Sequence, residues 1–449
     1  MTTETRTGTD AASPPALTQG RVWRLAGPIM LSNLTVPLPG LVDSILMGHL
    51  PEARYLAGVA LGAMVFNVVY WAFVFLRKST SGLTAQALGR RDGDASRSVL
   101  ARALLLAGTI GLALVALQVP LLAAALSLVD GTSAAEAVAQ DYVLIRIWGA
   151  PAFMANMALM GWFVGMQSMR TVLLLQILLN GLNVLLDLVF VLGLGMTADG
   201  VAAATVLAEY AALAAGLLCL RRPLASLPGR LLRGTLLEPA ELRRLLAINR
   251  DIFIRTLCLV FALAFFTAQG ARQGDAILAA NAVLQHFVHL MAFGLDGISN
   301  AAEALVGQAV GARRRAVLRR AVVLCAQSAF AMSLIFALIY LLAGPWIVAL
   351  FTDQPELRET ATRFVLWLAL APPVAVWSFL FDGVFIGATR ARDMRDTMLV
   401  SVALYLAAWA LLMPLYGNDG LWAAFLILFA ARGATLALRY PALEKAVPK

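Results

Sequence analysis

The chain has 449 residues, of which 61% are hydrophobic and 14% charged, and its mean hydropathy is +0.81. A soluble protein of this length would carry about 25% charged residues, so the composition excludes a soluble globular protein and indicates a polytopic helical membrane protein. Three cysteines, Cys219, Cys258 and Cys325, lie far apart in apolar runs, and with only three histidines they exclude a disulfide framework or a metal cluster.

The chain begins with a polar stretch that contains Pro14 and Pro15. It lacks a basic region followed by an apolar one, so it does not have the pattern of a signal peptide. We predict that residues 1–20 form a disordered cytoplasmic tail.

The first apolar run, residues 26–50, is long enough to cross a bilayer and carries three prolines and one acid, Asp43. Proline inside a helix removes a backbone hydrogen bond and bends the helix. A carboxylate at membrane depth costs at least about 2.5 kcal/mol, so an acid there is a candidate for function. We interpret this run as a bent helix that moves during function.

Charge-poor runs predict twelve membrane spans in all, and therefore an all-α protein. The predicted spans are residues 26–50, 55–76, 103–129, 143–166, 171–195, 200–220, 251–271, 276–300, 321–351, 361–388, 396–416 and 420–438.

The basic residues predict the orientation of these spans. Of the 35 Lys and Arg residues, 30 fall at the two termini and in the connections after even-numbered spans. Because basic residues are retained on the cytoplasmic side, both termini are predicted to be cytoplasmic. Topology therefore accounts for the net charge of +9, and nucleic-acid binding is not needed to explain it.

An internal repeat divides the chain into two halves. A shift of 222 residues places residues 55–92 on residues 277–314, with Gln86-Ala87-Leu88-Gly89 on Gln308-Ala309-Val310-Gly311. Each half has six spans, which indicates a parallel repeat of two lobes around a central pathway and favours a transporter over a channel. The predicted domains are an N-lobe at residues 21–220, a cytoplasmic linker at 221–250, a C-lobe at 251–440 and a cytoplasmic tail at 441–449.

Polar residues inside spans of the N-lobe share helical faces, as the spacing of Asn180, Asn183 and Asp187 shows. If Asp43 and Asp187 face a common interior, two carboxyl groups in a poorly hydrated site can hold a proton between them, which a proton-coupled carrier requires. The same oxygen-rich cluster could instead coordinate Na⁺. Further members of the predicted polar network are Thr205, Glu209 and Asn156.

The second half offers two candidates for coupling, Asp296 and Asp382. Glu303 is predicted to be interfacial and structural. The deep parts of the spans show acids and no deep arginine, which argues against a flippase for lipid-linked precursors, since such a flippase needs positive charge in its cavity.

Enzyme signatures are not found: the chain has no phosphate-binding GxxxxGK[ST] loop and no zinc-protease HExxH motif. We therefore expect a transporter driven by an ion gradient, with no catalytic residues, no cofactor and no metal site.

Several stretches resemble the multidrug and toxic compound extrusion (MATE) family, in particular its DinF-like branch. They are PIMLSNLTVPLPGLVDSILMGHL in the first span, NGLNVLLDLVFVLGL in the fifth, DGVAAATVLAEYA in the sixth, and FDGVFIGATRARDMR near the end of the tenth. The resemblance covers about residues 20–440 and implies a V-shaped, two-lobe exporter of organic, often cationic or amphipathic compounds in antiport with H⁺ or Na⁺.

The resemblance also implies roles for single residues. Asp43 matches the usual proton site of this branch, and Pro28 matches the proline at which the first helix bends. Asn183, Asp187 and Thr205 match the polar residues of the fifth and sixth helices. The expected protein is a monomeric H⁺-coupled exporter of the bacterial inner membrane; the alternatives are an Na⁺-coupled antiporter and a lipid-linked precursor flippase.

Overall fold

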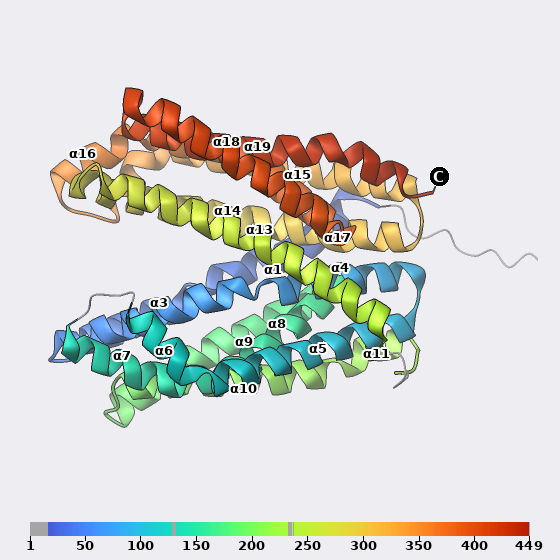
Figure 1. Cartoon of the computed structure of the whole chain (residues 1–449), viewed down its shortest axis with the longest axis horizontal. Coiled ribbons are helices and arrows are strands. Elements are labelled where there is room, and N and C mark those ends of the chain that lie inside the picture. The colour runs from blue at the N-terminus through green and yellow to red at the C-terminus, as the bar shows by residue number, and fades with distance from the viewer. Residues whose placement is uncertain (1–16, 128–131, 232–235, 237, 449) are drawn as a thin grey trace, which may run out of the picture.

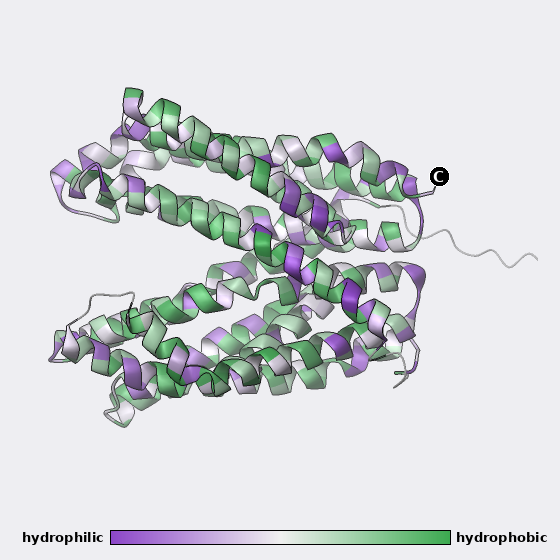
Figure 2. Ribbon diagram, viewed as in Figure 1, coloured by the Kyte–Doolittle hydropathy of each residue, from purple (hydrophilic) through white to green (hydrophobic). Residues whose placement is uncertain are grey.

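The computed structural model describes residues 17–127, 132–231, 236 and 238–448, and these residues are helical apart from short connections. Twelve helical segments in the described part of the chain are long and apolar enough to span a membrane. This confirms the predicted all-α fold and the number of spans. Hydrophobic residues cover most of the length of the helices, and hydrophilic residues concentrate toward the ends (Figure 2).

The first half of the chain contributes six spans, most of them built from two pieces. A proline or a short turn interrupts the helix in several of them, for example at Val36–Pro37 between α1 and α2. The helices are α1 (Gln19–Thr35), α2 (Leu38–Gly48), α3 (Ala53–Ala72), α4 (Phe75–Arg90), α5 (Gly93–Ala116), α6 (Gln118–Leu126), α7 (Ser133–Arg146), the 3₁₀ turn η1 (Ile147–Gly149), α8 (Ala150–Gly165), α9 (Met169–Asp187), the π-helix η2 (Leu188–Gly193), α10 (Ala198–Cys219) and α11 (Arg221–Ser226).

The second half contributes six more spans, all of them continuous helices. They pack into a group that lies apart from the helices of the first half over much of its length (Figure 1). The helices are α13 (Pro239–Ala271), α14 (Asp275–Gly311), α15 (Arg315–Ala349), α16 (Pro355–Arg363), α17 (Val365–Gly387), α18 (Ala391–Tyr416) and α19 (Asn418–Lys445).

The helices extend further than the apolar runs predict. The predicted linker at residues 221–250 contains α11 and the first twelve residues of α13, and the predicted tail at 441–449 begins inside α19. Of the predicted tail at 1–20, residues 1–16 lie outside the described residues, and α1 already begins at Gln19. The reason is that Arg, Lys and Glu favour the helix as strongly as most apolar residues, so a helix continues past the point where the chain leaves the bilayer core.

The two halves meet mainly through α14, which packs against α1 and α4 of the first half. The contact is reciprocal: a Cβ atom at Gly89 would collide with the backbone oxygen of Gln308, and one at Gly311 with that of Gln86. These are the repeat-related residues that the sequence aligns, and only glycine permits such close approach of two helix backbones.

Candidate coupling site

The first predicted site residue, Asp43, lies on α2, the part of the first span beyond the Val36–Pro37 break. α2 packs chiefly against α3 and α9 of its own half, whereas α1 packs against both α9 of its own half and α14 of the other half. The break therefore separates a segment that contacts both halves from a segment packed chiefly within the first, and Asp43 belongs to the latter.

Asp187 is fully buried at the last residue of α9, where the helix passes into the π-helix η2. π-helical turns are rare and frequently mark functional sites. The carboxyl groups of Asp43 and Asp187 lie within hydrogen-bonding reach of each other. The structure thus brings together the two acids that the sequence singles out.

No donor among the described residues reaches either carboxyl oxygen of Asp187, Oδ1 of Asp43 or Oδ1 of Asn183. Two ionised carboxylates can only accept hydrogen bonds, so this pair can form one with each other only when a proton lies between them. The side-chain oxygens gathered here could also ligate a monovalent cation, since carboxylate and amide oxygens suit hard cations.

The remaining predicted polar residues join neighbouring helices of the N-lobe to one another. Asn183 donates to the Thr205 hydroxyl on α10 at 3.0 Å, and Asn180 donates to the Thr35 hydroxyl on α1 at 2.8 Å. Asn156, on α8, donates to the main-chain carbonyl of Glu209 at 2.9 Å. Asn183 and Thr205 therefore lie beside the acid pair, whereas Asn156 ties two helices together.

Glu209 forms a buried ion pair with Arg146 of α7, with nitrogen–oxygen distances of 2.6 and 3.0 Å. The Arg146 guanidinium also lies over the rings of Phe66 and Tyr70, 5.1 and 5.4 Å from the ring centroids. It is close enough to Asp43 to interact with it electrostatically. Arg146 is a part of the site that the sequence analysis misses, because it lies near the start of the predicted span 143–166, where a long basic side chain usually reaches water.

The expectation of no deep arginine is wrong. Several buried or partly buried basic residues inside the spans are paired with acids: Arg146 with Glu209, Arg77 and Lys78 with Asp296, and Arg255 and Arg432 with Asp382. A count that assigns each basic residue to a connection between spans does not detect these residues, because apolar stretches lie on both sides of them. The acids inside other spans are the signal that could have revealed these basic residues, because a buried charge requires a partner of opposite charge.

Both acids that were predicted as coupling candidates in the second half, Asp296 and Asp382, are paired with basic side chains. Asp296 accepts from Asn300 and lies 3.6 Å from Lys78 and 3.7 Å from Arg77, both on α4. Asp382 lies between Arg432, at 2.8 Å, and Arg255, to which it is also hydrogen-bonded. Asp296 therefore joins the two halves, and Asp382 holds three helices of the second half together.

Pro28 lies inside α1, which is helical on both sides of it. In this structure the interruption of the first span is at Val36–Pro37, eight residues further along. No group of three or more His, Cys, Asp or Glu side chains in the described ranges is placed to hold a metal ion.

Comparison with known proteins identifies the family. The pattern of the MatE family matches residues 28–189 and 252–411. The chain is 43% identical over 422 residues to the DNA damage-inducible protein F of Escherichia coli K12, covering 93% of this chain and 90% of that protein. The chain belongs to the MATE family.

More distant relatives agree. A probable multidrug resistance protein NorM of Caulobacter vibrioides is 27% identical, with 87% of this chain and 82% of that protein covered. A solved structure described as the outward-facing conformation of a multidrug resistance MATE family transporter superimposes with a TM-score of 0.87 at 20% identity, covering 95% of this chain and 97% of that one. A crystal structure of MATE in complex with MaL6 gives a TM-score of 0.84 at 20% identity and the same coverage.

These findings confirm the predicted family, its DinF-like branch and its fold. The chain is a multi-pass membrane protein and an efflux transporter, and it is not an enzyme.

Proposed function

We propose that this transporter exports small organic compounds, often cationic or amphipathic, in antiport with protons that bind between Asp43 and Asp187. One observation carries the proposal: these two carboxyl groups face each other, and no donor among the described residues reaches Oδ1 of Asp43 or either carboxyl oxygen of Asp187. A proton between the two carboxyl groups relieves their repulsion and supplies the missing donor.

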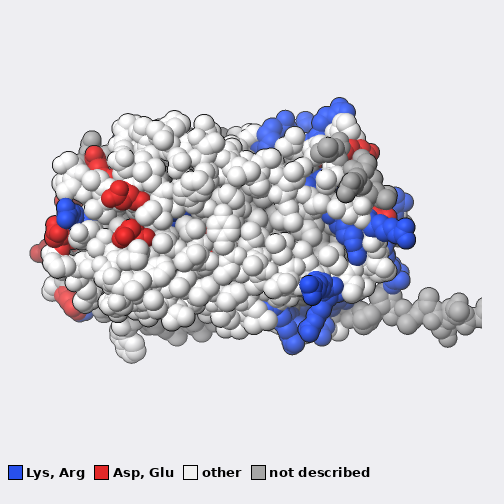
Figure 3. All heavy atoms as spheres, turned by 90° about the horizontal axis from the view of Figure 1, so that it is seen from below, with Lys and Arg blue, Asp and Glu red and all other residues white. Residues whose placement is uncertain are grey.

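We also propose that the basic end of the molecule faces the cytoplasm of a bacterial cell, with the inner membrane around the spans. Lys and Arg gather at one end of the molecule and Asp and Glu at the other (Figure 3). Both described chain ends contact the start of α15 at the basic end, through Arg320 to the Leu17 carbonyl and Arg315 to the Val447 carbonyl. The excess of basic residues supports a cytoplasmic assignment of this end.

In this orientation the halves are closed toward the cytoplasm, since Gly89 and Gly311 make their contacts near the cytoplasmic ends of α4 and α14.

We propose that protonation of the acid pair lets the first span bend at Pro28, which reduces the space in the N-lobe and expels substrate outward. Substrate binding then favours proton release, because linkage is reciprocal. A single chain encloses the pathway between its own halves, so a monomer suffices.

The test is efflux of a fluorescent organic cation from proteoliposomes under an imposed pH gradient or an imposed Na⁺ gradient. The variants are Asp43→Asn and Asp187→Asn, which preserve size and remove charge. Asp141→Asn, on the exposed surface of α7, is the matched control.

We expect efflux driven by the pH gradient alone, lost in both site variants and kept in the control. Substrate affinity, measured separately by fluorescence anisotropy, should depend less on pH in the variants, because the proposed linkage between proton and substrate acts through these two carboxyl groups. Efflux driven by Na⁺ and indifferent to Asp43 would refute proton coupling at this pair. Loss of efflux in Asp141→Asn as well would show that the effect is not specific to the site.

A further inference from the structure

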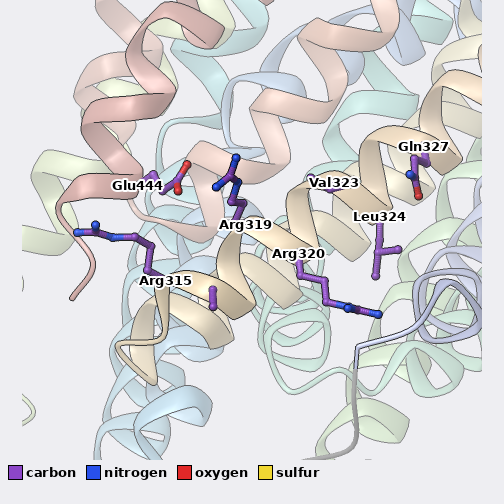
Figure 4. A pocket seen from close by; sticks show the side chains of 8 residues that line it. Arg315, Arg319, Arg320, Val323, Leu324, Gln327 and Glu444 are labelled. Carbon is purple, nitrogen blue, oxygen red and sulfur yellow. The ribbon is translucent and has the colours of Figure 1, made fainter. Parts of the chain in front are cut away.

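A cavity of about 800 Å³ opens at the start of α15, at the basic end of the C-lobe (Figure 4). Its walls carry three arginines and one acid, Glu444 from the end of α19, so the ionised groups that line it have an excess positive charge. The lining residues are Arg315, Ala316, Arg319, Arg320, Val323, Leu324, Gln327 and Glu444.

Two of the arginines are held in place by the protein itself. Arg315 donates to the carbonyl groups of Lys445 and Val447, both at 2.8 Å, and Arg320 donates to the carbonyl of Leu17 at 2.8 Å. Arg319 forms no hydrogen bond or ion pair with any residue that the structure describes, and its side chain is exposed. Its guanidinium is thus available to an anion from outside the chain.

The internal repeat provides a comparison for this arginine. The shift of 222 residues places Arg97 of α5 at the position of Arg319. Arg97 donates to the carbonyl groups of Leu224 and Leu227, both at 2.7 Å, so the end of α11 and the residue after it lie against this arginine in the N-lobe. In the C-lobe the chain end lies against the start of α15 too, but Arg315 holds it, through the carbonyl groups of Lys445 and Val447, and Arg319 has no such partner among the described residues.

An apolar strip leads from the cavity along α15 toward the middle of the membrane. Val323, Phe330, Leu334 and Leu338 follow one another at spacings of seven, four and four residues, which places them on one side of the helix. Their exposed fractions are 47%, 41%, 48% and 56%. Arginines at the end of a span followed by an exposed apolar strip match a molecule with an anionic head and hydrocarbon tails.

We propose that this cavity binds an anionic phospholipid, with its phosphate on Arg319 and its acyl chains along Val323, Phe330 and Leu334. A phosphate oxyanion accepts paired hydrogen bonds from a guanidinium, and basic pockets between membrane helices on the cytoplasmic side suit acidic lipid headgroups. The phosphate takes on Arg319 the place that the carbonyl groups of Leu224 and Leu227 take on Arg97. This site is separate from the acid pair and does not depend on the coupling ion.

The test is native mass spectrometry of the full chain, delipidated in a neutral detergent and titrated with phosphatidylglycerol or phosphatidylcholine. Arg319→Gln removes the arginine that has no partner and leaves the two anchored ones. Arg320→Gln removes an arginine of the same cavity whose side chain points away from Arg319 (Figure 4). Arg244→Gln on the exposed start of α13 is the matched control, since it removes the same charge outside the cavity.

We expect the first phosphatidylglycerol to bind more tightly than phosphatidylcholine and to be weakened about tenfold by Arg319→Gln, the loss expected for one charge-assisted hydrogen bond. Arg320→Gln and the control should both bind as the wild type does. Equal binding of both lipids, or equal losses in the control, would overturn the proposal. Displacement of the lipid by millimolar glycerol 3-phosphate would overturn it too, since it would identify a site for soluble phosphate.

Discussion

Arg146 and Glu209 form a bidentate ion pair in the interior of the N-lobe, with both side chains buried. Gly149, on the turn after α7, makes room for it, since a Cβ atom there would collide with the Glu209 carboxylate. The pair lies next to the coupling acids and holds α7 against α10. Its charge is internally balanced, and among the described residues no basic side chain is in hydrogen-bonding contact with Asp43 or Asp187.

We predict that Glu209→Gln destabilises the protein strongly, because it leaves the Arg146 guanidinium buried without a counter-charge. Breaking a buried pair from one side costs about 3–5 kcal/mol, whereas replacing both partners by apolar residues is often neutral. Thermal unfolding in detergent should show a large loss for Glu209→Gln and recovery in Arg146→Met/Glu209→Leu. Glu52→Gln, which removes an exposed ion pair with Arg54, is the control. A wild-type melting temperature for Glu209→Gln would contradict this account.

The second prediction concerns the contact between the halves. Lys78 of α4 lies 3.4 Å from Glu303 and 3.6 Å from Asp296 of α14. Glu303→Gln should weaken the closed contact and increase the population open toward the cytoplasm; a shift of about 1.4 kcal/mol changes that population tenfold.

Cysteine labelling measures this shift. Ala85 is fully buried, and its Cβ atom lies where a side chain at Gly307 would collide with it. In a chain without its native cysteines, Ala85→Cys should react with a maleimide about tenfold faster when Glu303→Gln is added. Asp353→Asn, at an exposed ion pair with Arg358, should leave the rate unchanged. Equal rates in all three proteins would show that Lys78 and Glu303 do not hold the halves together.

The third prediction separates coupling from stability in the C-lobe. Asp382 is the counter-ion of both Arg255 and Arg432, so Asp382→Asn leaves two positive charges without an acid. We expect a lower melting temperature and lower yield, with efflux driven by a pH gradient retained per folded molecule. A variant that folds normally and loses efflux driven by Na⁺ would instead place a coupling site in this lobe.

Most of the fold could be predicted from sequence because hydrophobicity and charge report directly on spans. The repeat gave the two halves, and the structure explains its best-matched segment, since Gln86 and Gln308 lie at the reciprocal contact of α4 and α14. The helices were predicted to be too short, because a charged residue such as Glu241 interrupts the apolar pattern without ending the helix.

The acid pair could also be predicted, because an unpaired carboxyl group inside an apolar run stands out by its cost. The partners of the other acids could not. Arg77, Arg255 and Arg432 lie within a turn or two of the predicted span ends, where long basic side chains usually reach water. Only the packing of the helices shows that these side chains point inward to Asp296 and Asp382.

The last prediction concerns the backbone contact between the halves. Because a Cβ atom at Gly311 would collide with the backbone oxygen of Gln86, Gly311→Ala forces α14 away from α4. Hydrogen–deuterium exchange should rise in residues 79–91 and 300–311, since the closed contact protects both. Gly181→Ala is the control, because no atom lies within 4 Å of a Cβ there and alanine favours the helix by about 1 kcal/mol. Gly89→Ala, the repeat-related change, should raise exchange in the same two segments, because the contact is reciprocal. An effect at Gly311 without one at Gly89 would show that the two halves do not contribute equally to closing the cytoplasmic end.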